Sequence, residues 1–510
     1  MIGGGLTGAG IARDLALRGL SVMLLEKDDW GRGASTWLLH GGPRSFDVDW
    51  DSTQVALQET AQIVSAAPHL ARRRAMLVPV LTGERLPALP GSVPHMRVAG
   101  GEARRLEPGL SPHVTEALVL EEWSVDPHRL AWANVLDAVR SGADAHNHTR
   151  VESLLREGPQ VAGVRYRAPD GRRAEATARV VVNAAGPWAP QVCALAGVDL
   201  PLRLAKAVHV VYDRQLSGLP ISAEAVDGGE VVLLPHGGAT LLGAADADHY
   251  GDPDAPEALP DDVDYLVQAA EQVFPSIREH RPVRAAASVR GALFQWRTPA
   301  GDLPRGFEVV DHERRDRVPG LVSVAGGTLG LYRLTAERTA DAVCSRLGVR
   351  AGGTTAGRPL PGAGGVAPPA RELARDHGIP SLAAARILRR HGSEAAEVLQ
   401  DQRRGRLVCR CEALTEAELV HAARQEQVRT LTDAFRRVGL AAGPCAGAAC
   451  VERAAEVLGR ELGWSPGQRR EACRDYQTAA WAGRAPVLDR WGWAQEELAY
   501  GVRRGWPGGL

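Results

Sequence analysis

A chain of 510 residues is too long for one ordinary domain, and two to four domains are expected. Hydrophobic residues make up 45% of it, which is enough for a sizeable core, and the formal net charge of −1 gives no electrostatic case for nucleic-acid binding. No stretch approaches the roughly 18 to 20 apolar residues that span a bilayer, and no charged-then-apolar signal segment is found, so we expect a cytoplasmic protein.

The first segment, residues 1 to about 45, predicts a strand, a turn, a helix and a second strand. Gly3, Gly5 and Gly8 match the pattern G-x-G-x-x-G, in which glycines permit a tight turn and a close approach of the backbone to a pyrophosphate. Glu26 ends the second apolar run, where a carboxylate can bind a ribose hydroxyl. The segment therefore predicts a dinucleotide site, and the alternative is a glycine-rich turn with nothing bound.

The first strand is short in this sequence, because only Met1 and Ile2 precede Gly3. A central parallel strand needs about five residues. We expect the native chain to begin earlier, with Met1 inside the strand. An N-terminal peptide mass that began at Met1 would contradict this expectation.

The middle of the chain alternates apolar runs typical of strands with helical patterns, which predicts a mixed α/β region. Residues 321–348 repeat the order of strand, glycine pair and helix. Glycine and proline are then dense from about residue 350 to residue 370, which predicts a linker. The sequence beyond the linker is mostly helical in pattern.

Four cysteines near the C-terminal end form two tight pairs, a C-x-C pair and a C-x4-C pair. Two such pairs separated by helical sequence predict one site with four thiolate ligands. Zinc is the competing interpretation, but structural zinc favours pairs spaced C-x2-4-C and often includes histidine. The three remaining cysteines, Cys193, Cys344 and Cys473, stand alone and are expected to be buried thiols. The paired cysteines are Cys409, Cys411, Cys445 and Cys450.

The order of these motifs resembles a known family. The segments "IGGGLTGAGIARDLALRGLSVMLLEKDD", "GASTWLLHGGPRS", "VVVNAAGPWA" and "VAGGTLGLYRLTAERTADAV" resemble FAD-dependent glycerol-3-phosphate dehydrogenases, which belong to the D-amino-acid-oxidase-like flavoproteins. The segments "VCRCEALTEAEL" and "GPCAGAACVERAA" resemble a bacterioferritin-associated-ferredoxin-like [2Fe-2S] module, which follows the flavin domain in the catalytic polypeptide of the anaerobic enzyme. The resemblance covers nearly the whole chain.

The resemblance implies an α/β protein with a Rossmann-like FAD-binding fold, a mixed-sheet substrate domain and a small helical C-terminal iron–sulfur domain. The implied oxidoreductase domain covers residues 1–350. Its FAD-binding segments are about 1–80, 145–200 and 315–350, and its substrate-binding segments are about 80–145 and 200–315. A linker at 351–370, a helical connector at 371–405, a [2Fe-2S]-binding domain at 406–465 and a tail at 466–510 follow.

The resemblance also implies FAD as the dinucleotide. Gly3, Gly5, Gly8 and Glu26 match the family's ADP-binding positions. Further matches are expected to contact the pyrophosphate or the flavin, and the helix after the second glycine pair is expected to point its N-terminus at the flavin ring. These further positions are Ser35, Thr36, Ala185, Gly186, Gly326, Gly327 and Thr328.

Arginines and one histidine match the family's substrate pocket. Arg44, Arg290 and Arg333 fall at family arginine positions and are candidates for binding a phosphate, although each could instead form a structural ion pair. His209 is the candidate base that accepts the hydroxyl proton, or otherwise a core histidine.

The pocket also departs from the family pattern. Thr328 stands where the family carries a lysine, Ser45 replaces an aromatic residue, and Trp37 stands where several members carry lysine or glycine. Glycerol 3-phosphate is therefore the first expectation for the substrate. Another small hydroxy or amino acid, or a catalytically silent redox or regulatory module, remains open.

The implied reaction oxidises sn-glycerol 3-phosphate to dihydroxyacetone phosphate. Electrons then pass through the [2Fe-2S] centre to a respiratory acceptor. In the family they continue through separate B- and C-type subunits to menaquinone, which implies a protein held at the inner face of the cell membrane through its partners.

Overall fold

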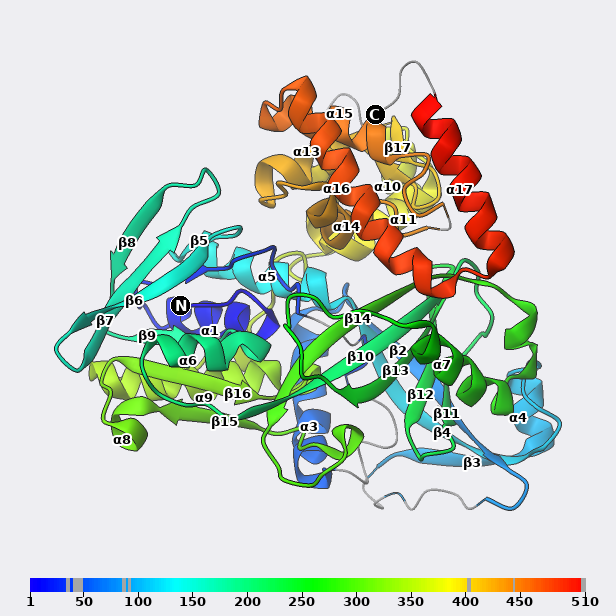
Figure 1. Cartoon of the computed structure of the whole chain (residues 1–510), viewed down its shortest axis with the longest axis horizontal. Helices are drawn as coiled ribbons and strands as arrows, with labels where there is room; N and C mark the ends of the chain where they lie inside the picture. Colours follow the sequence, from blue (N-terminus) through cyan, green and yellow to red (C-terminus); the bar gives the residue numbers. More distant parts are fainter. Residues whose placement is uncertain are drawn as a thin grey trace.

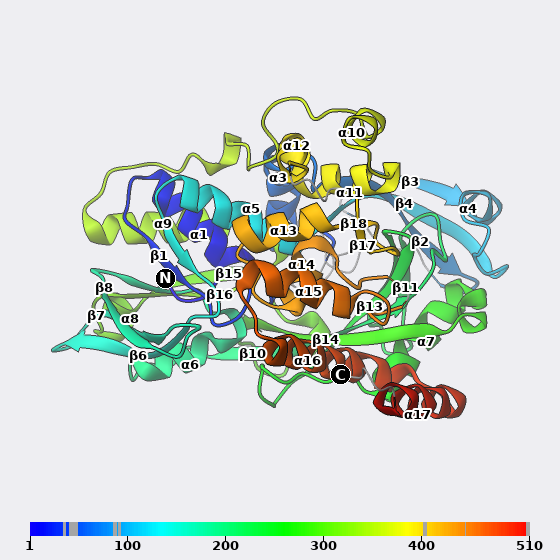
Figure 2. The same cartoon turned by 90° about the horizontal axis from the view of Figure 1, so that it is seen from above.

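The structure is a computed structural model that describes residues 1–33, 37–39, 49–84, 89, 93–400, 405–443 and 445–505 (Figures 1 and 2). The N-terminal sheet is centred on Ile2, which forms parallel bridges with Leu25 of β1 on one side and with Asn183 of β9 on the other. β5 pairs with β1 and β16 pairs with β9, both in parallel, and β15 adds an antiparallel edge. The expected Rossmann-like arrangement is therefore present. The strands are β1 (Met23–Leu25), β5 (Asp144–His146), β9 (Val181–Asn183), β15 (Phe307–Asp311) and β16 (Leu321–Gly326).

Helices cover one face of this sheet, and a small antiparallel sheet and a helix cover the other. Apolar side chains of α1, α5 and α9 form one core cluster, in which Ile11, Val135 and Ala340 are fully buried. The opposite face packs against β6, β7, β8 and α6, around Val161 and Cys193. The elements are α1 (Leu6–Leu17), α5 (Pro127–Arg140), α9 (Tyr332–Leu347), β6 (Arg150–Glu157), β7 (Gln160–Arg167), β8 (Arg173–Thr177) and α6 (Ala189–Leu195).

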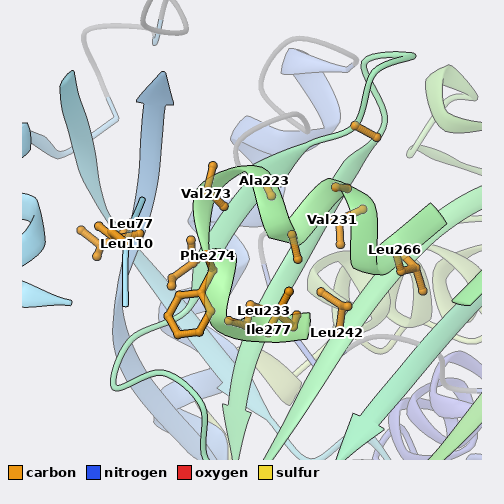
Figure 3. Packing of buried hydrophobic residues seen from close by; sticks show 14 of the residues in the cluster. Leu77, Leu110, Ala223, Val231, Leu233, Leu242, Leu266, Val273, Phe274 and Ile277 are labelled. Carbon is orange, nitrogen blue, oxygen red and sulfur yellow. The ribbon is translucent and has the colours of Figure 1, made fainter. Parts of the chain in front are cut away.

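The second large sheet of the N-terminal part is mixed and has eight strands, in the order β14-β10-β13-β12-β11-β2-β4-β3. α7 lies on one face, where Leu266, Val273 and Phe274 pack against the strands (Figure 3). This burial fixes the sheet and leaves its other face for the site. The elements are β2 (Ala71–Leu81), β3 (His95–Ala99), β4 (Val114–Val125), β10 (Leu202–Tyr212), β11 (Ile221–Glu224), β12 (Glu230–His236), β13 (Ala239–Asp248), β14 (Pro282–Leu293) and α7 (Pro260–Val273), with α3 (Trp50–Ala66), α4 (Gly100–Leu106) and α8 (His312–Asp316) elsewhere in the N-terminal part.

The expected segment boundaries need correction at three elements. β2 was expected in an FAD segment, but it pairs with β4 and β11 in the eight-stranded sheet. α5 and β15 were expected in substrate segments, but both belong to the N-terminal sheet and its helical layer. The reason is that each element is placed by its partner strands and its apolar face, which lie far away in the sequence.

The C-terminal part is helical, as expected from its pattern, and lies against the N-terminal part (Figure 1). The glycine- and proline-rich segment before it is anchored, because the Leu360 N–H donates to the Ala66 carbonyl at 2.8 Å and the Leu360 side chain is buried. The elements are α10 (Ala370–His377), α11 (Ser381–His391), α12 (Ala395–Val398), β17 (Leu407–Cys409), β18 (Leu414–Thr415), α13 (Glu416–Gln425), α14 (Leu431–Val438), α15 (Val451–Leu462), α16 (Pro466–Arg484) and α17 (Arg490–Gly505).

Buried polar contacts join the two parts. Arg437 of α14 pairs with Asp29 at 2.6 Å, and the indole of Trp30 donates to the side chain of Gln427 at 3.2 Å. Asp29 and Trp30 follow β1 by only a few residues, so the C-terminal helices contact the loop that continues from the dinucleotide-binding strand. Among the described helices, none is long and apolar enough to cross a membrane.

Candidate functional site

A cavity of about 1020 Å³ lies between the two sheets. Its walls include the carboxyl ends of the N-terminal parallel strands, which is where ligands bind in open α/β sheets. The structure brings together at this cavity most residues that the sequence singled out, from segments more than three hundred positions apart. They are Gly3, Gly5, Gly8, Glu26, Ala185, Gly186, His209, Arg290, Gly326, Gly327 and Thr328.

The glycine turn joins Ile2 to α1 at one end of this cavity. Gly3 has φ +102°, a conformation that favours glycine, and a Cβ on Gly8 would lie 2.0 Å from the Gly3 carbonyl oxygen. A Cβ on Gly5 would meet no atom within 4 Å, so open space lies before it. Because α1 begins at Leu6, the unpaired N–H groups of its first turn are available to an anionic group there.

Glu26 is held by two backbone donors. Its carboxylate accepts from the Gly4 N–H at 2.6 Å and from the Asp28 N–H at 2.8 Å. Burial raises the pKa of Glu26, and these hydrogen bonds oppose that rise. The carboxylate is therefore fixed beside the glycine turn, where the ribose of a dinucleotide would lie.

The two other predicted glycine segments follow the ends of parallel strands. Ala185 and Gly186 follow β9, and Gly326 ends β16. Gly326 and Gly327 have φ of +70° and +91°, and the Gly327 N–H donates to the Gly306 carbonyl at 2.7 Å. Thr328 comes next, immediately before a short 3-10 helix and α9, which places a helical N-terminus at the cavity.

The opposite wall of the cavity is the eight-stranded sheet. Arg290 of β14 and Asp246 of β13 lie on either side of β10, opposite Ala205 and Ala207. The Arg290 guanidinium donates to Asp246 through Nε at 3.1 Å and through Nη2 at 2.8 Å. Because directly opposed residues share a face of a sheet, the small alanines leave room in which this ion pair can reach the cavity.

His209 lies further along β10 on the same cavity. Burial lowers its pKa to about 4, and the more distant carboxylate of Asp246 opposes this only in part. The imidazole is therefore neutral at neutral pH, which is the form that accepts a proton.

Several cavity residues were missed by the sequence analysis. Asp246 of β13 is one of them. Lys27 is another; it forms an ion pair with Asp254, and its ammonium lies 4.0 Å from the centre of the Trp188 ring. Trp37, which the sequence marked only as a departure from the family's pocket pattern, also lines the cavity, with its ring centre 4.3 Å from that of His236. Long-range pairing of this kind has no local sequence pattern.

The expectation for Arg333 is corrected by the structure. Its guanidinium is buried and donates to Glu59 through Nη2 at 2.8 Å, and it also pairs with Glu337 and reaches Thr355. Arg333 is not among the residues that line the cavity. We therefore assign Arg333 a structural role, in which its buried ion pair with Glu59 joins α9 to α3.

Arg333→Ala should lower the free energy of unfolding by about 3 to 5 kcal/mol, because it would leave Glu59 charged, buried and without this partner. Denaturant unfolding measures the change. Glu59→Gln combined with Arg333→Met should recover much of the loss. A variant that kept full stability but lost substrate affinity would restore the catalytic interpretation.

Three predicted site residues, Ser35, Thr36 and Arg44, lie outside the described residues, as does Ser45. Their expected contacts with the cofactor and the substrate remain predictions from the sequence.

The four paired cysteines lie together in the C-terminal part. Cys411 and Cys445 are 3.8 Å apart between sulfur atoms, and Cys409 forms a hydrogen bond with Cys450 that lowers the pKa of Cys409 to about 6. A Cβ on Gly443 would lie 2.4 Å from the Cys411 Cβ, so glycine is required beside this pair. Cys409 ends β17, and Cys450 precedes α15.

The sulfur atoms form two pairs rather than one compact group. Among the described residues, no three of these sulfurs lie within 4.8 Å of one another. Tetrahedral zinc with bonds of about 2.3 Å would place every pair of sulfurs about 3.8 Å apart. The other three cysteines, Cys193, Cys344 and Cys473, are buried thiols, as expected.

Comparison with known families covers most of the chain. Residues 1–340 match the family described as "FAD dependent oxidoreductase", and residues 353–469 match the family described as "C-terminal domain of alpha-glycerophosphate oxidase". The first match contains the cavity residues described above. The second contains all four paired cysteines.

Individual relatives match over nearly their whole length. The chain is 32% identical to the A-type polypeptide of the anaerobic glycerol-3-phosphate dehydrogenase of Haemophilus influenzae, over 98% of this chain and 91% of that protein. It is 33% identical to the polypeptide of the same name from Escherichia coli K12, over 98% of this chain and 94% of that protein.

Solved structures show the same architecture. A glycerol-3-phosphate dehydrogenase from Bacillus halodurans, complexed with FAD, matches with a TM-score of 0.79 and 26% identity, over 96% of this chain and 95% of that one. A glycine oxidase from Bacillus cereus matches with a TM-score of 0.51 and 20% identity, over 68% of this chain and 96% of that one, which is a likeness of fold alone.

Proposed function

Because the chain belongs to the FAD-dependent oxidoreductases and, among them, to the glycerol-3-phosphate dehydrogenase family, we propose that it oxidises sn-glycerol 3-phosphate to dihydroxyacetone phosphate. The observation that carries the proposal is the cavity itself, which is lined by the glycine turn, His209 and Arg290. One end of the cavity fits a dinucleotide, and the other end offers His209 as a base and the guanidinium of Arg290 as a positively charged group.

The residues present fit FAD. The open space before Gly5 admits a pyrophosphate, the free N–H groups of α1 can donate to it, and Glu26 can accept from a ribose hydroxyl. Gly326 and Gly327 line the cavity with positive φ values, and the flavin ring would lie beside their backbone. When bound, FAD supplies the acceptor for the hydride that leaves the substrate carbon.

The opposite wall supplies the remaining groups. His209 is neutral and can take the proton of the substrate hydroxyl at one ring nitrogen. Arg290 is oriented by Asp246, and in the described residues no hydrogen bond from its Nη1 is found, so this nitrogen can donate to a phosphate oxygen.

For the cysteine centre we propose a [2Fe-2S] cluster with two thiolates on each iron. The pairs Cys411 with Cys445 and Cys409 with Cys450 support it, because each would hold one iron, whereas a single zinc requires all four sulfurs around one point. A cluster of this kind passes electrons singly. The cysteines hold it between α13, α15 and α16.

Partner subunits complete the proposal. The relatives from Haemophilus influenzae and Escherichia coli are named as one lettered subunit of their enzyme, which supports further electron-transfer subunits here. We propose B- and C-type partners that carry electrons to menaquinone and hold this chain at the inner face of the membrane.

Arg290→Ala should raise the KM for glycerol 3-phosphate at least tenfold, because a hydrogen bond to a charged group contributes about 1.5 to 3 kcal/mol. Steady-state kinetics with an artificial acceptor measures it. Arg97→Ala is the matched control, because Arg97 of β3 forms an exposed ion pair with Glu116 of β4. An unchanged KM in Arg290→Ala would remove this arginine from the substrate site.

His209→Asn should lower the rate of flavin reduction by about 10² to 10⁴, the usual contribution of a positioned base. In the wild type, kcat/KM should not change through His209 between pH 6 and 8, and should fall as the pH drops through about 4, because protonation removes the accepting lone pair. Stopped-flow reduction across pH measures both. Equal rates in the two proteins would exclude His209 as the base.

The decisive experiment is an anaerobic titration of the purified protein with sn-glycerol 3-phosphate while the visible spectrum is recorded. Bleaching of the flavin bands followed by loss of iron–sulfur absorbance would support the substrate and the electron path together. Reduction of both centres by dithionite but of neither by glycerol 3-phosphate would contradict the substrate, and would favour another hydroxy or amino acid.

A further inference from the structure

A second cavity, of about 470 Å³, lies outside the proposed active site, between α5 of the N-terminal part and the helices α11 to α13. Three imidazoles and several charged groups line it. They are His69, His391, His421, Arg129, Arg140, Arg390, Glu394, Glu397 and Glu426. Neither the proposed reaction nor the proposed cluster uses any of these groups.

Three of the lining side chains converge on one point. His391, His421 and Glu426 each offer a ligand atom, and these atoms all lie within 4.8 Å of one another. The His391 Nδ1 atom is 3.6 Å from Glu426 Oε1, close to the edge of about 3.4 Å expected between two ligands of a tetrahedral cation with bonds of about 2.1 Å. We propose that these three residues bind a divalent transition-metal cation such as Zn²⁺, with the fourth position open to the cavity.

The contacts of His391 prepare it as a ligand. Its Nε2 lies 3.2 Å from Glu418 Oε1, and because a carboxylate can only accept, the ring proton lies on Nε2 and the lone pair on Nδ1. Glu418 is in turn held by Arg390 through two hydrogen bonds of 2.6 and 2.7 Å. A carboxylate behind the distal nitrogen is the usual partner of a metal-bound histidine, because it orients the ring.

Glu426 is also in its metal-binding form. Arg129 donates to both of its oxygens through Nη1, at 2.9 and 2.8 Å, and this contact favours the ionised carboxylate. An ionised carboxylate has about four lone-pair sites, so each oxygen can still coordinate a cation. The metal would replace only the long contact of 3.4 Å from Arg129 to the His391 Nδ1.

One unsatisfied nitrogen atom lines the same cavity. The His69 Nδ1 is buried without a hydrogen-bond partner. Buried polar atoms without partners are uncommon in folded proteins and point to an ion or water that completes them. A coordinated cation with its bound water would do so here.

The position of the site gives the cation a structural role. His391 ends α11, His421 lies in α13 and Glu426 directly follows α13, and Arg129 on α5 supports the site through Glu426. A bound cation would therefore tie the helical connector to the cysteine domain at their contact with the N-terminal part. This inference does not rest on the proposed reaction.

Metal analysis of the full-length protein tests the proposal. We expect about one equivalent of Zn²⁺ or a similar dication per chain in the wild type, in addition to any metal held by the cysteines. His421→Ala should lose that equivalent while keeping its iron and FAD. His113→Ala, which changes an exposed histidine elsewhere, is the matched control and should keep all three.

A second measurement uses protein dialysed against a chelator. Zn²⁺ at about a hundred times its Kd should raise the Tm of the wild type and of His113→Ala by about 2 to 8 °C, and should leave His421→Ala and Glu426→Gln unchanged. The proposal is overturned if wild type and His421→Ala contain the same metals, or if Zn²⁺ shifts all four proteins equally.

Discussion

Gly8→Ala should produce a protein that retains less than a tenth of the FAD of the wild type and is less stable by about 3 kcal/mol or more. The added Cβ would lie 2.0 Å from the Gly3 carbonyl oxygen, and both atoms belong to the turn itself, so the backbone must move. The flavin-to-protein absorbance ratio after gel filtration and the unfolding of the apoprotein measure the two effects.

Gly5→Ala separates cofactor binding from folding at the same turn. Gly5 has φ −62° and ψ 176°, which any residue adopts, and its Cβ would meet no protein atom within 4 Å. The apoprotein should therefore keep its stability within about 1 kcal/mol, while FAD binding weakens because the methyl group takes the space of the pyrophosphate. Gly101→Ala, at an open position in α4, is the control for both properties. FAD binding that survived in Gly5→Ala would contradict the assignment of the turn.

Cys411→Ser should lower the iron content to less than a tenth of the wild type and leave the FAD content unchanged. The flavin should still bleach with substrate, but transfer to an external acceptor should fall at least a hundredfold, because Cys411 and Cys445 are proposed to share one iron. Iron analysis and acceptor-linked turnover measure these effects.

Cys473→Ala is the matched control, because Cys473 is a buried thiol in the same core cluster but not one of the proposed ligands. It should keep its iron and its turnover. Full iron in Cys411→Ser, or zinc in place of iron in the wild type, would contradict the proposed cluster.

The local parts of the proposed site can be recognised in the sequence. The glycine turn and Glu26 could be identified because their spacing reflects one strand, one turn and one helix that are continuous in the chain. Gly326 and Gly327 can be recognised in the same way, because both have positive φ values, a backbone conformation that strongly favours glycine. The cysteine pairs were recognisable for a similar reason, because each pair lies within one loop.

Residues whose role depends on a distant partner could not be assigned in this way. Arg333 matched a family position, but Glu59 draws its guanidinium away from the cavity. Arg290 does reach the cavity, yet its partner Asp246 lies on a different strand and was not singled out in the sequence. An arginine alone does not reveal which carboxylate it will meet.

By itself, the sequence determined the fold class, the position of the dinucleotide turn and the four cysteines, because short-range spacing and apolar periodicity encode these features. Only the tertiary structure decided which charged groups line the cavity, such as Arg290, and which form buried ion pairs elsewhere, such as Arg333. It also brought His391, His421 and Glu426 together beside α5, although nothing in their spacing marks a site. The physical reason is that electrostatic pairing and ligand geometry depend on distances in space, which the packing of the sheets and helices sets.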